Sequence, residues 1–376
     1  MNEIAEIYVG LDVHKETTAA AIAEAGRQGE VRFWGEFESN PAALTRLFNK
    51  LGNHYAQIAV CYEAGPCGYW IYRWCVQHQI HCNVVAPSHI RRTPNELRMK
   101  NDHRDAMTLA RLYRSGELTH VWVPDETHEA MRDLVRVREA ASEDRRRARQ
   151  RIRSFLLKYQ YHYNAKCWTK RHRIWLSDRC FPIAAQQIAF QNHLNALEQV
   201  EARITEIEQQ IQELLPHWTL GCQVEALQAL RGVALVVAVN FVCEVGDIHR
   251  FERPRQLMAF LGLVPGEHSS GGSHRPRGIT KVGNTHLRSI LFEAAWNYTK
   301  RPKIGQYQLQ HRNDALPQHA RDIAWKAQVR LTKRYRYLMA RGKRSTVAIT
   351  AVARELVGFM WAIAIEVTPI PIAAEI

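Results

Sequence analysis

The chain of 376 residues has no long hydrophobic run and no closely spaced cysteines. Its longest apolar runs, 233–239 and 356–365, are shorter than the roughly 20 residues that cross a membrane, so we expect no transmembrane helix. The first six residues include two acids and no basic residue, so we expect no secretory signal and a cytoplasmic protein. None of the eight cysteines forms a C-x-x-C pair, which argues against a zinc module and for reduced thiols.

The composition excludes an extensively disordered chain. Hydrophobic residues make up 46% of the sequence and charged residues 23%, as in folded proteins. At about 150 residues per domain, the length predicts two or three domains.

Positive charge is concentrated in two stretches of the sequence. Lysines and arginines outnumber acids by 15 to 5 over residues 130–179 and by 13 to 3 over residues 301–360. Each block has a net charge of +10 whereas the whole chain has +14, so the other 266 residues are weakly acidic. Such localised positive charge indicates a polyanionic partner, namely DNA or RNA.

The first block combines arginines with aromatic residues. Arginines neutralise phosphates and aromatic rings stack on unpaired bases, which predicts a nucleic-acid-binding segment. An isolated charge run would be a solvated helix, but the second block favours binding. The residues concerned are Arg145, Arg146, Arg147, Arg149, Arg151 and Arg153, then Tyr159, Tyr161, Tyr163, Trp168 and Trp175, and in the second block Lys333, Arg334 and Arg336.

Hydrophobic patterning divides the chain into an α/β part and all-α parts. The predicted strands are 6–13, 17–23, 31–37, 57–62 and 80–85, with helices at 41–51 and from about 66. Three strands followed by alternating helices and strands indicate a mixed sheet, in the layout of the ribonuclease-H-like fold. We expect three domains, which are an α/β domain at 1–124, a basic helical and coiled-coil region at 125–216, and a mainly helical domain at 217–376.

A heptad pattern lies in the middle region. Its apolar residues are Leu197, Val200, Ile204, Ile207, Ile211 and Leu214. The pattern predicts a coiled-coil-like helix that ends at Pro216. This apolar seam would pack either against residues 130–160 of the same chain or against a second chain in a dimer.

Four carboxylates fall at the ends of predicted elements. Asp12 ends the first strand, Glu63 follows the fourth, and Asp102 and Asp105 share one face at the start of a predicted helix. Taken singly, Asp102 would be a helix cap and Glu63 a loop residue. Together they would repel one another unless divalent cations neutralised them, and oxygen ligands suit Mg²⁺ or Mn²⁺.

The motifs around these acids resemble those of the DEDD transposases of bacterial insertion sequences, which are related to Piv-type DNA invertases. The three acidic motifs are 10–15 (GLDVHK), 62–66 (YEAGP) and 100–106 (KNDHRDA). The similarity continues through 260–265 (FLGLVP), 269–272 (SSGG), 278–284 (GITKVGN) and 287–288 (LR).

The resemblance implies a RuvC-like domain, a connecting coiled coil and a C-terminal transposase domain. It implies that Asp12, Glu63, Asp102 and Asp105 bind the metal, and that Ser270 is a nucleophile because it directly precedes the glycines of its motif. It further implies a structured noncoding guide RNA that pairs with target and donor DNA. Because exchanging strands between two duplexes requires several active sites, we expect a homo-oligomer, either a dimer or a tetramer.

The residue types around Ser270 suit phosphoryl transfer. A metal or base activates a serine hydroxyl, and a phosphoserine bond would conserve the ester energy for rejoining. Without the family, Ser-Ser-Gly-Gly is more typical of a surface turn, and Ser269 is a neighbouring candidate. The cations predicted to bind phosphate near this loop are Arg275, Arg277, Lys281 and Arg288.

Three other functions are compatible with parts of the sequence. A RuvC-like junction nuclease or a hydrolytic transposase would use the four acids without Ser270. Sugar kinases and actin-like ATPases open with a similar strand, but the sequence has no second glycine-rich phosphate loop at suitable spacing. A non-catalytic RNA- or DNA-packaging protein would explain the charge but not the acids.

Overall fold

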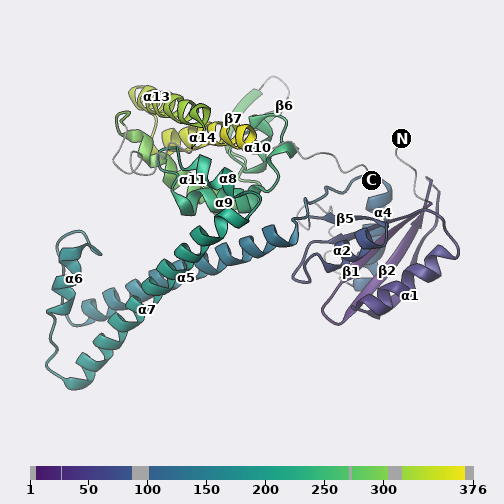
Figure 1. Cartoon of the computed structure of the whole chain (residues 1–376), viewed down its shortest axis with the longest axis horizontal. Coiled ribbons are helices and arrows are strands. Elements are labelled where there is room, and N and C mark those ends of the chain that lie inside the picture. The colour runs from purple at the N-terminus through teal and green to yellow at the C-terminus, as the bar shows by residue number, and fades with distance from the viewer. Residues whose placement is uncertain (1–5, 27, 87–100, 271–272, 304–315, 369–376) are drawn as a thin grey trace. The chain divides into compact units, whose positions relative to one another are not determined.

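The computed structural model describes residues 6–26, 28–86, 101–270, 273–303 and 316–368. The chain forms two compact units, Met1–Val123 and Pro124–Ile376 (Figure 1). The first unit is built around a mixed β-sheet, and the second is largely helical.

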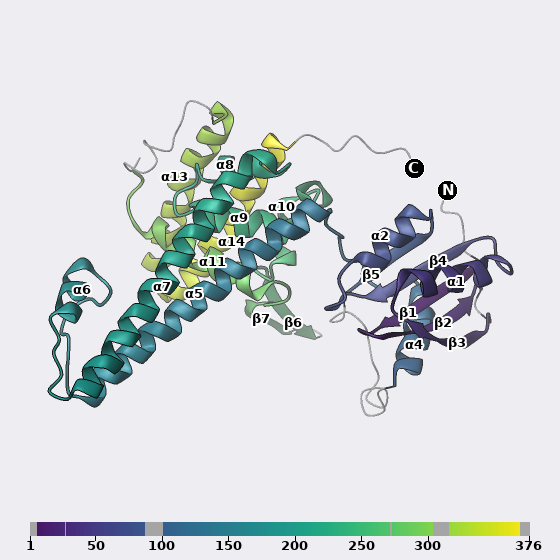
Figure 2. The same cartoon turned by 60° about the horizontal axis from the view of Figure 1, so that its bottom comes forward.

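The sheet has five strands in the order β3-β2-β1-β4-β5 (Figures 1 and 2). The strands are β1 (Ile7–Val13), β2 (Thr17–Glu24), β3 (Val31–Glu38), β4 (Ile58–Glu63) and β5 (His81–Val85). The first three form an antiparallel meander, whereas β4 is parallel to β1 and β5 is parallel to β4. The five predicted strands are confirmed, with ends that differ by one residue at most.

Helices cover both faces of this sheet. They are α1 (Pro41–Gly52), α2 (Trp70–Gln77) and α4 (Asp102–Arg114). Alternate residues of β1, such as Val9 and Leu11, are buried in one core with α1 and α2. Small alanines of β2 pack with α4 in a second core. The alternation along β1 and β2 therefore places each helix on its own face.

Helix α4 lies unusually close to the backbone of β1. Gly10 permits this approach, because a Cβ atom at that position would collide with the backbone of Ala106 and Ala110. The glycine of the motif 10–15 therefore has a packing function. It holds the first turn of α4 beside the end of β1.

The second unit begins with a long helical hairpin. Its helices are α5 (Glu126–Lys158) and α7 (Ala184–Leu214), and α6 (Lys170–Ser177) lies in the connection between them (Figure 2). The helices run antiparallel, since Arg138 near the start of α5 bonds Glu208 near the end of α7. Farther along, Arg149 bonds Glu201.

The heptad seam of α7 is buried inside this hairpin. Leu197, Ile204, Ile207 and Ile211 are each 6% exposed or less and pack in cores that include residues of α5. Leu214 at the end of the seam is 43% exposed. Of the two predicted alternatives, the structure shows the intramolecular one, because the seam packs against α5 of the same chain.

The rest of the second unit is a helical bundle with one β-hairpin. Its elements are α8 (Gly221–Leu227), α9 (Leu235–Val245), α10 (Pro254–Phe260), β6 (Pro265–Ser270), β7 (Ser273–Ile279), α11 (Thr285–Ala295), α13 (Gln318–Ala340) and α14 (Ser345–Val367), with one-turn helices η2 (Leu215–His217), η3 (Ile248–Arg250) and η4 (Trp296–Thr299). The hairpin β6-β7 was not predicted from the sequence.

Helix α14 is the core helix of this bundle. It is long and apolar enough to cross a membrane, but 50% of its most apolar 18-residue stretch is buried inside the protein. It packs against α8, α10, α11 and α13. Burial by these helices accounts for its apolar composition.

Candidate carboxylate site and basic groove

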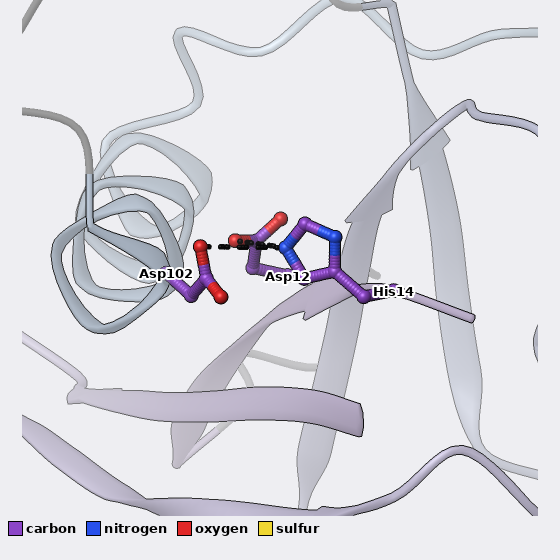
Figure 3. Close-up of side chains that lie close together, drawn as sticks. All are labelled: Asp12, His14 and Asp102. Carbon is purple, nitrogen blue, oxygen red and sulfur yellow. Dashed lines mark ion pairs between the residues drawn. The ribbon is translucent and has the colours of Figure 1, made fainter. Parts of the chain in front are cut away.

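Two of the predicted acids meet a histidine where β1 ends. Asp12 is the penultimate residue of β1, and Asp102 is the first residue of α4. The Nε2 atom of His14 lies 3.3 Å from Oδ2 of Asp12 and 3.4 Å from Oδ1 of Asp102 (Figure 3). One ligand atom from each of the three residues lies within 4.8 Å of the other two, so a single cation fits among them.

Asn101, and not Asp102, caps helix α4. The Asn101 side chain accepts a hydrogen bond of 3.0 Å from the backbone N–H of His103. Asp102 and Asp105 both lie in the first turn, where the helix dipole stabilises negative charge. The alternative in which Asp102 serves only as a helix cap is therefore wrong.

The other two acids lie near Asp12. The parallel pairing of β1 with β4 brings the ends of both strands to one edge of the sheet, which places Glu63 next to Asp12. Asp12, Glu63 and Asp105 line one hollow together with His14. Asp102 does not line this hollow and joins the cluster through its contact with His14.

Burial and neighbouring negative charges disfavour the ionised form of Asp12. Burial raises the pKa of Asp12 above its ordinary value of 3.8; His14 opposes this rise, and the negative charges of Asp105 and Asp102 add to it. Its Oδ2 atom is buried and makes no hydrogen bond of good geometry with any described residue. A buried carboxylate oxygen without such a bond, surrounded by further carboxylates, fits a divalent metal ion.

The histidine of this cluster was assigned no function by sequence reasoning, although it belongs to the motif 10–15. Side chains two residues apart along a strand lie on the same face, so the spacing of Asp12 and His14 was the available signal. The Ser39 hydroxyl donates a hydrogen bond of 2.8 Å to the His14 carbonyl and fixes the turn. Imidazole nitrogen is a better ligand for Mn²⁺ and other transition metals than for Mg²⁺.

The predicted nucleophile ends a strand of the second unit. The backbone of Ser270 is the last position of β6 and pairs with Ser273 of β7. Gly271 and Gly272 lie outside the described residues. The side chains of 267–277, which include Ser269, Ser270, Arg275 and Arg277, are also outside the described set.

Two glycines that flank this hairpin in sequence have a packing function. A Cβ atom on Gly262 would collide with the Val282 backbone, and one on Gly283 would collide with the Phe260 backbone. Both glycines have positive φ angles, 64° and 80°. The two motifs 260–265 and 278–284 are therefore held against each other.

Of the two described cations predicted near this loop, one is exposed and one is held by the protein. Lys281 is exposed and has a φ of 60°. The guanidinium of Arg288 donates hydrogen bonds to the carbonyls of Leu261 and Val282 at 2.9 and 3.1 Å. Arg288 thus braces the contact between the two motifs, a function that the sequence did not predict.

A groove in the second unit brings arginines of α5 together with aromatic residues. Of the six predicted arginines, Arg147 and Arg151 do not line it. The lining arginines are Arg138, Arg145, Arg146, Arg149 and Arg153, and the facing rings are Tyr161, Tyr163, Trp168, His172 and Trp175. Tyr159 packs instead against Phe155 in the adjoining core.

Several of these arginines are already paired within the chain. Arg149 bonds Glu201 at 2.8 Å, and Arg146 bonds Glu143 at 2.7 Å. Arg145 has no ion pair with a described carboxylate, and burial together with neighbouring arginines lowers its pKa. The groove therefore contains positive charge that is incompletely neutralised by the protein.

Six of the 13 lysines and arginines of the second basic block lie on α13. Arg334 contacts Glu355 at 3.2 Å, whereas Lys333 and Arg336 are exposed. Residues 304–315 of this block lie outside the described residues.

The chain thus combines an α/β unit that carries clustered acids with a helical unit that carries a basic groove. A family model described as "Transposase IS116/IS110/IS902 family" matches residues 224–309, and a transposase model for the DEDD group matches residues 9–161. The first model thus covers part of the bundle, from α8 to η4, and the second covers the carboxylate site and α5.

Similar proteins extend this match over most of the chain. A putative transposase of Sinorhizobium fredii is 52% identical over 96% of this chain and 89% of its own length. The transposase for insertion sequence element IS1533 of Leptospira borgpetersenii is 31% identical over 90% of this chain and 98% of its own. A pilin gene-inverting protein of Moraxella bovis is 25% identical over 78% and 83%. The chain belongs to the IS110/IS116/IS902 family of transposases.

Proposed function

We propose that this protein is an insertion-sequence transposase that cuts and rejoins DNA strands at a metal-binding site formed by Asp12, Glu63, Asp102 and Asp105. The observation that carries the proposal is the convergence of these acids, from three separate elements, on the buried Oδ2 atom of Asp12. A packaging protein would have no use for this costly arrangement.

We also propose that the first unit is a ribonuclease-H-like, RuvC-like domain. The strand order 3-2-1-4-5, with a meander followed by two parallel strands, supports this assignment. So does the location of the acids at the ends of β1 and β4 and on a following helix. The hairpin of α5 and α7 would be the coiled-coil region at 125–216, and the bundle the transposase domain at 217–376.

In this proposal a bound Mg²⁺ or Mn²⁺ ion would neutralise the phosphodiester and lower the pKa of the attacking hydroxyl. The chain's own residues position that chemistry. Asp12 and Glu63 are fixed by paired strands, and Asp102 and Asp105 by the rigid first turn of α4. The Nε2 atom of His14 lies 3.3 Å from an oxygen of Asp12 and 3.4 Å from an oxygen of Asp102, beside the proposed metal position.

The proposed nucleophile is Ser270, whose hydroxyl oxygen would bond to a DNA 5′ phosphate while the bond from that phosphorus to the 3′ oxygen of the preceding nucleotide breaks and leaves a 3′ hydroxyl. Its support is the motif 269–272 and the place of Ser270 at the end of β6, next to the two motifs braced by Arg288. In Ser270→Ala no protein–DNA adduct is expected on a denaturing gel, whereas Ser269→Ala should form one. An adduct peptide containing a modified Ser269 would place the nucleophile one residue earlier, and protein-free DNA ends would eliminate the covalent step.

The proposed partners are target and donor DNA and a structured noncoding guide RNA. Two blocks of charge +10 support a second nucleic acid in addition to the DNA substrate. The reaction would take place in the bacterial cytoplasm in a dimer or tetramer. Since the heptad seam is buried within the chain, that assembly needs another contact surface.

The test is strand exchange by the purified full chain on a donor and a target duplex. Asp105→Asn should abolish exchange while leaving nucleic-acid binding nearly unchanged, because it removes a metal ligand and no phosphate contact. The matched control is Glu36→Gln, an exposed carboxylate on β3. Full exchange by Asp105→Asn, or exchange that survives thorough chelation, would contradict the proposed site.

A further inference from the structure

We propose that the groove along α5 binds a single-stranded segment of nucleic acid, with successive phosphates on a row of arginines and an unpaired base on the facing aromatic rings. The inference rests on the proposed function only in that the protein handles nucleic acid. It adds which structural form of nucleic acid is bound and where. The groove lies entirely within the second unit.

The row of arginines has the geometry of a phosphate track. Arg145, Arg149 and Arg153 are four residues apart along α5, so they lie on one side of the helix. Four residues of an α-helix rise by about 6 Å, which is comparable to the separation of successive phosphates along a strand. Arg145 and Arg153 have no ion pair with a described carboxylate, whereas Arg149 is held in place by Glu201. The row therefore combines a fixed central guanidinium with two that lack an anion.

The facing wall is a cluster of rings around α6. His172 and Trp175 are nearly parallel, with an interplanar angle of 13° and centroids 5.8 Å apart. Tyr163 lies 4.6 Å from His172 and 5.2 Å from Trp175. Tyr163, Trp168 and Trp175 are each partly exposed. The cluster thus has ring surface that the protein core does not cover.

One residue joins the two walls of the groove. The guanidinium of Arg149 lies 4.9 Å from the ring centroid of Trp168 and also bonds Glu201. A strand whose phosphates follow the arginines is thereby brought next to aromatic surface. This juxtaposition of a charge row and rings is typical of proteins that bind single strands.

The rings favour an unpaired base over a duplex. In a duplex the faces of the bases are stacked on one another, and only phosphates and groove edges are accessible. A duplex would contact the arginines and leave the rings unused. Selectivity for single strands is therefore the property that the aromatic wall supplies.

The test compares single-stranded with double-stranded oligonucleotides on the full chain. Fluorescein-labelled RNA and DNA of about 12 nucleotides, a length within the range of single-strand sites, are titrated by anisotropy alongside the matching duplexes. Trp175→Ala should weaken single-strand binding by about 5- to 150-fold, the value of one lost stacking contact. Duplex binding should change less than about 2-fold.

Two further variants separate stacking from charge. Trp175→Phe keeps an aromatic face and should retain most of the single-strand affinity, which also guards against a folding defect in Trp175→Ala. Arg145→Gln should weaken both forms and lower the single-strand salt slope by about 0.7. The matched controls are Trp34→Ala, a partly exposed ring in the first unit, and Arg203→Gln, an exposed arginine on α7; neither should change binding.

Crosslinking gives a readout that does not depend on variants. Single strands that contain 4-thiouridine or 4-thiothymidine should crosslink to Tyr163, Trp168 or Trp175 of the unaltered protein. Adducts only elsewhere would overturn the proposal, as would equal losses of single-strand and duplex affinity in Trp175→Ala. Tighter binding of RNA would identify the guide as the source of the segment, and tighter binding of DNA would identify a substrate strand.

Failure of the proposed single-strand site can be distinguished from failure of the proposed function. Asp105→Asn tests strand exchange without touching the groove, and Trp175→Ala tests the groove without touching the acids. If Trp175→Ala binds single strands like the unaltered protein, the single-strand site is wrong and the transposase proposal stands. If Asp105→Asn exchanges strands normally, the proposed metal site is wrong and the single-strand site stands.

Discussion

Replacing Asp12 with asparagine is expected to stabilise the metal-free protein while abolishing strand exchange. The Asp12 Oδ2 atom is buried without a hydrogen bond of good geometry to any described residue, and Asp102 and Asp105 surround it with negative charge. Asparagine has nearly the volume of aspartate and no charge. The substitution therefore removes repulsion without leaving a cavity.

The size of this effect follows from the geometry. The ligand atoms of Asp12 and Asp102 lie within 4.8 Å of each other. At an effective dielectric constant of about 20, two negative charges at this separation repel by about 3.5 kcal/mol. Asp102 is 52% exposed, so solvent screening reduces this repulsion. We expect the free energy of unfolding to increase by about 1 kcal/mol.

The increase in stability expected for Asp12→Asn depends on pH. Because the pKa of Asp12 is raised on folding, the folded protein binds this proton more tightly than the unfolded chain. The stability that the protonated carboxyl contributes is present below its ordinary value of 3.8 and is lost as the pH rises through the raised value. The advantage of Asp12→Asn should therefore be full above that range and disappear in acid.

The assay is urea unfolding of the full chain in EDTA and again in Mg²⁺, with Glu36→Gln as the control. In EDTA, Asp12→Asn should unfold at a higher urea concentration than the unaltered protein. Mg²⁺ should stabilise the unaltered protein, because ligand binding to the folded state adds to its stability, and should have little effect on Asp12→Asn. A loss of stability in EDTA would refute the electrostatic reasoning, and equal stabilisation by Mg²⁺ would refute metal binding by Asp12.

Two further substitutions test the packing that positions the sites. Gly10→Val should lower the free energy of unfolding by about 1–3 kcal/mol or more and abolish exchange, because its side chain would push α4 away from β1. The control Gly52→Ala has open space around a Cβ atom and should be neutral or slightly stabilising. Both are measured by thermal unfolding. Normal exchange by Gly10→Val would contradict the close approach. Ile211→Ala should destabilise the second unit by about 2–5 kcal/mol without changing the mass of the assembly by sedimentation, and the exposed Leu214→Ala should do neither. Dissociation of an oligomer by Ile211→Ala would mean that the seam also contacts another chain.

The sequence determined the elements whose signals are local. Alternating apolar residues along each strand predicted the five strands within one residue, because side-chain period and strand ends depend on neighbouring residues. The acids were located in the same way, at strand ends and in a first helical turn. The family was predicted as well, from motifs that are contiguous in sequence.

Only the tertiary structure decided which distant residues meet. His14 joined the acid cluster because α4, far along the chain, packs on the backbone of β1 at Gly10. The heptad pattern was compatible with either partner, and the return of α7 along α5 buried it within the chain. A run of arginines in the sequence was divided into paired and unpaired members by carboxylates such as Glu201, which lies 52 residues from Arg149. Such pairings depend on the packing of whole helices, and no local pattern in the sequence encodes them.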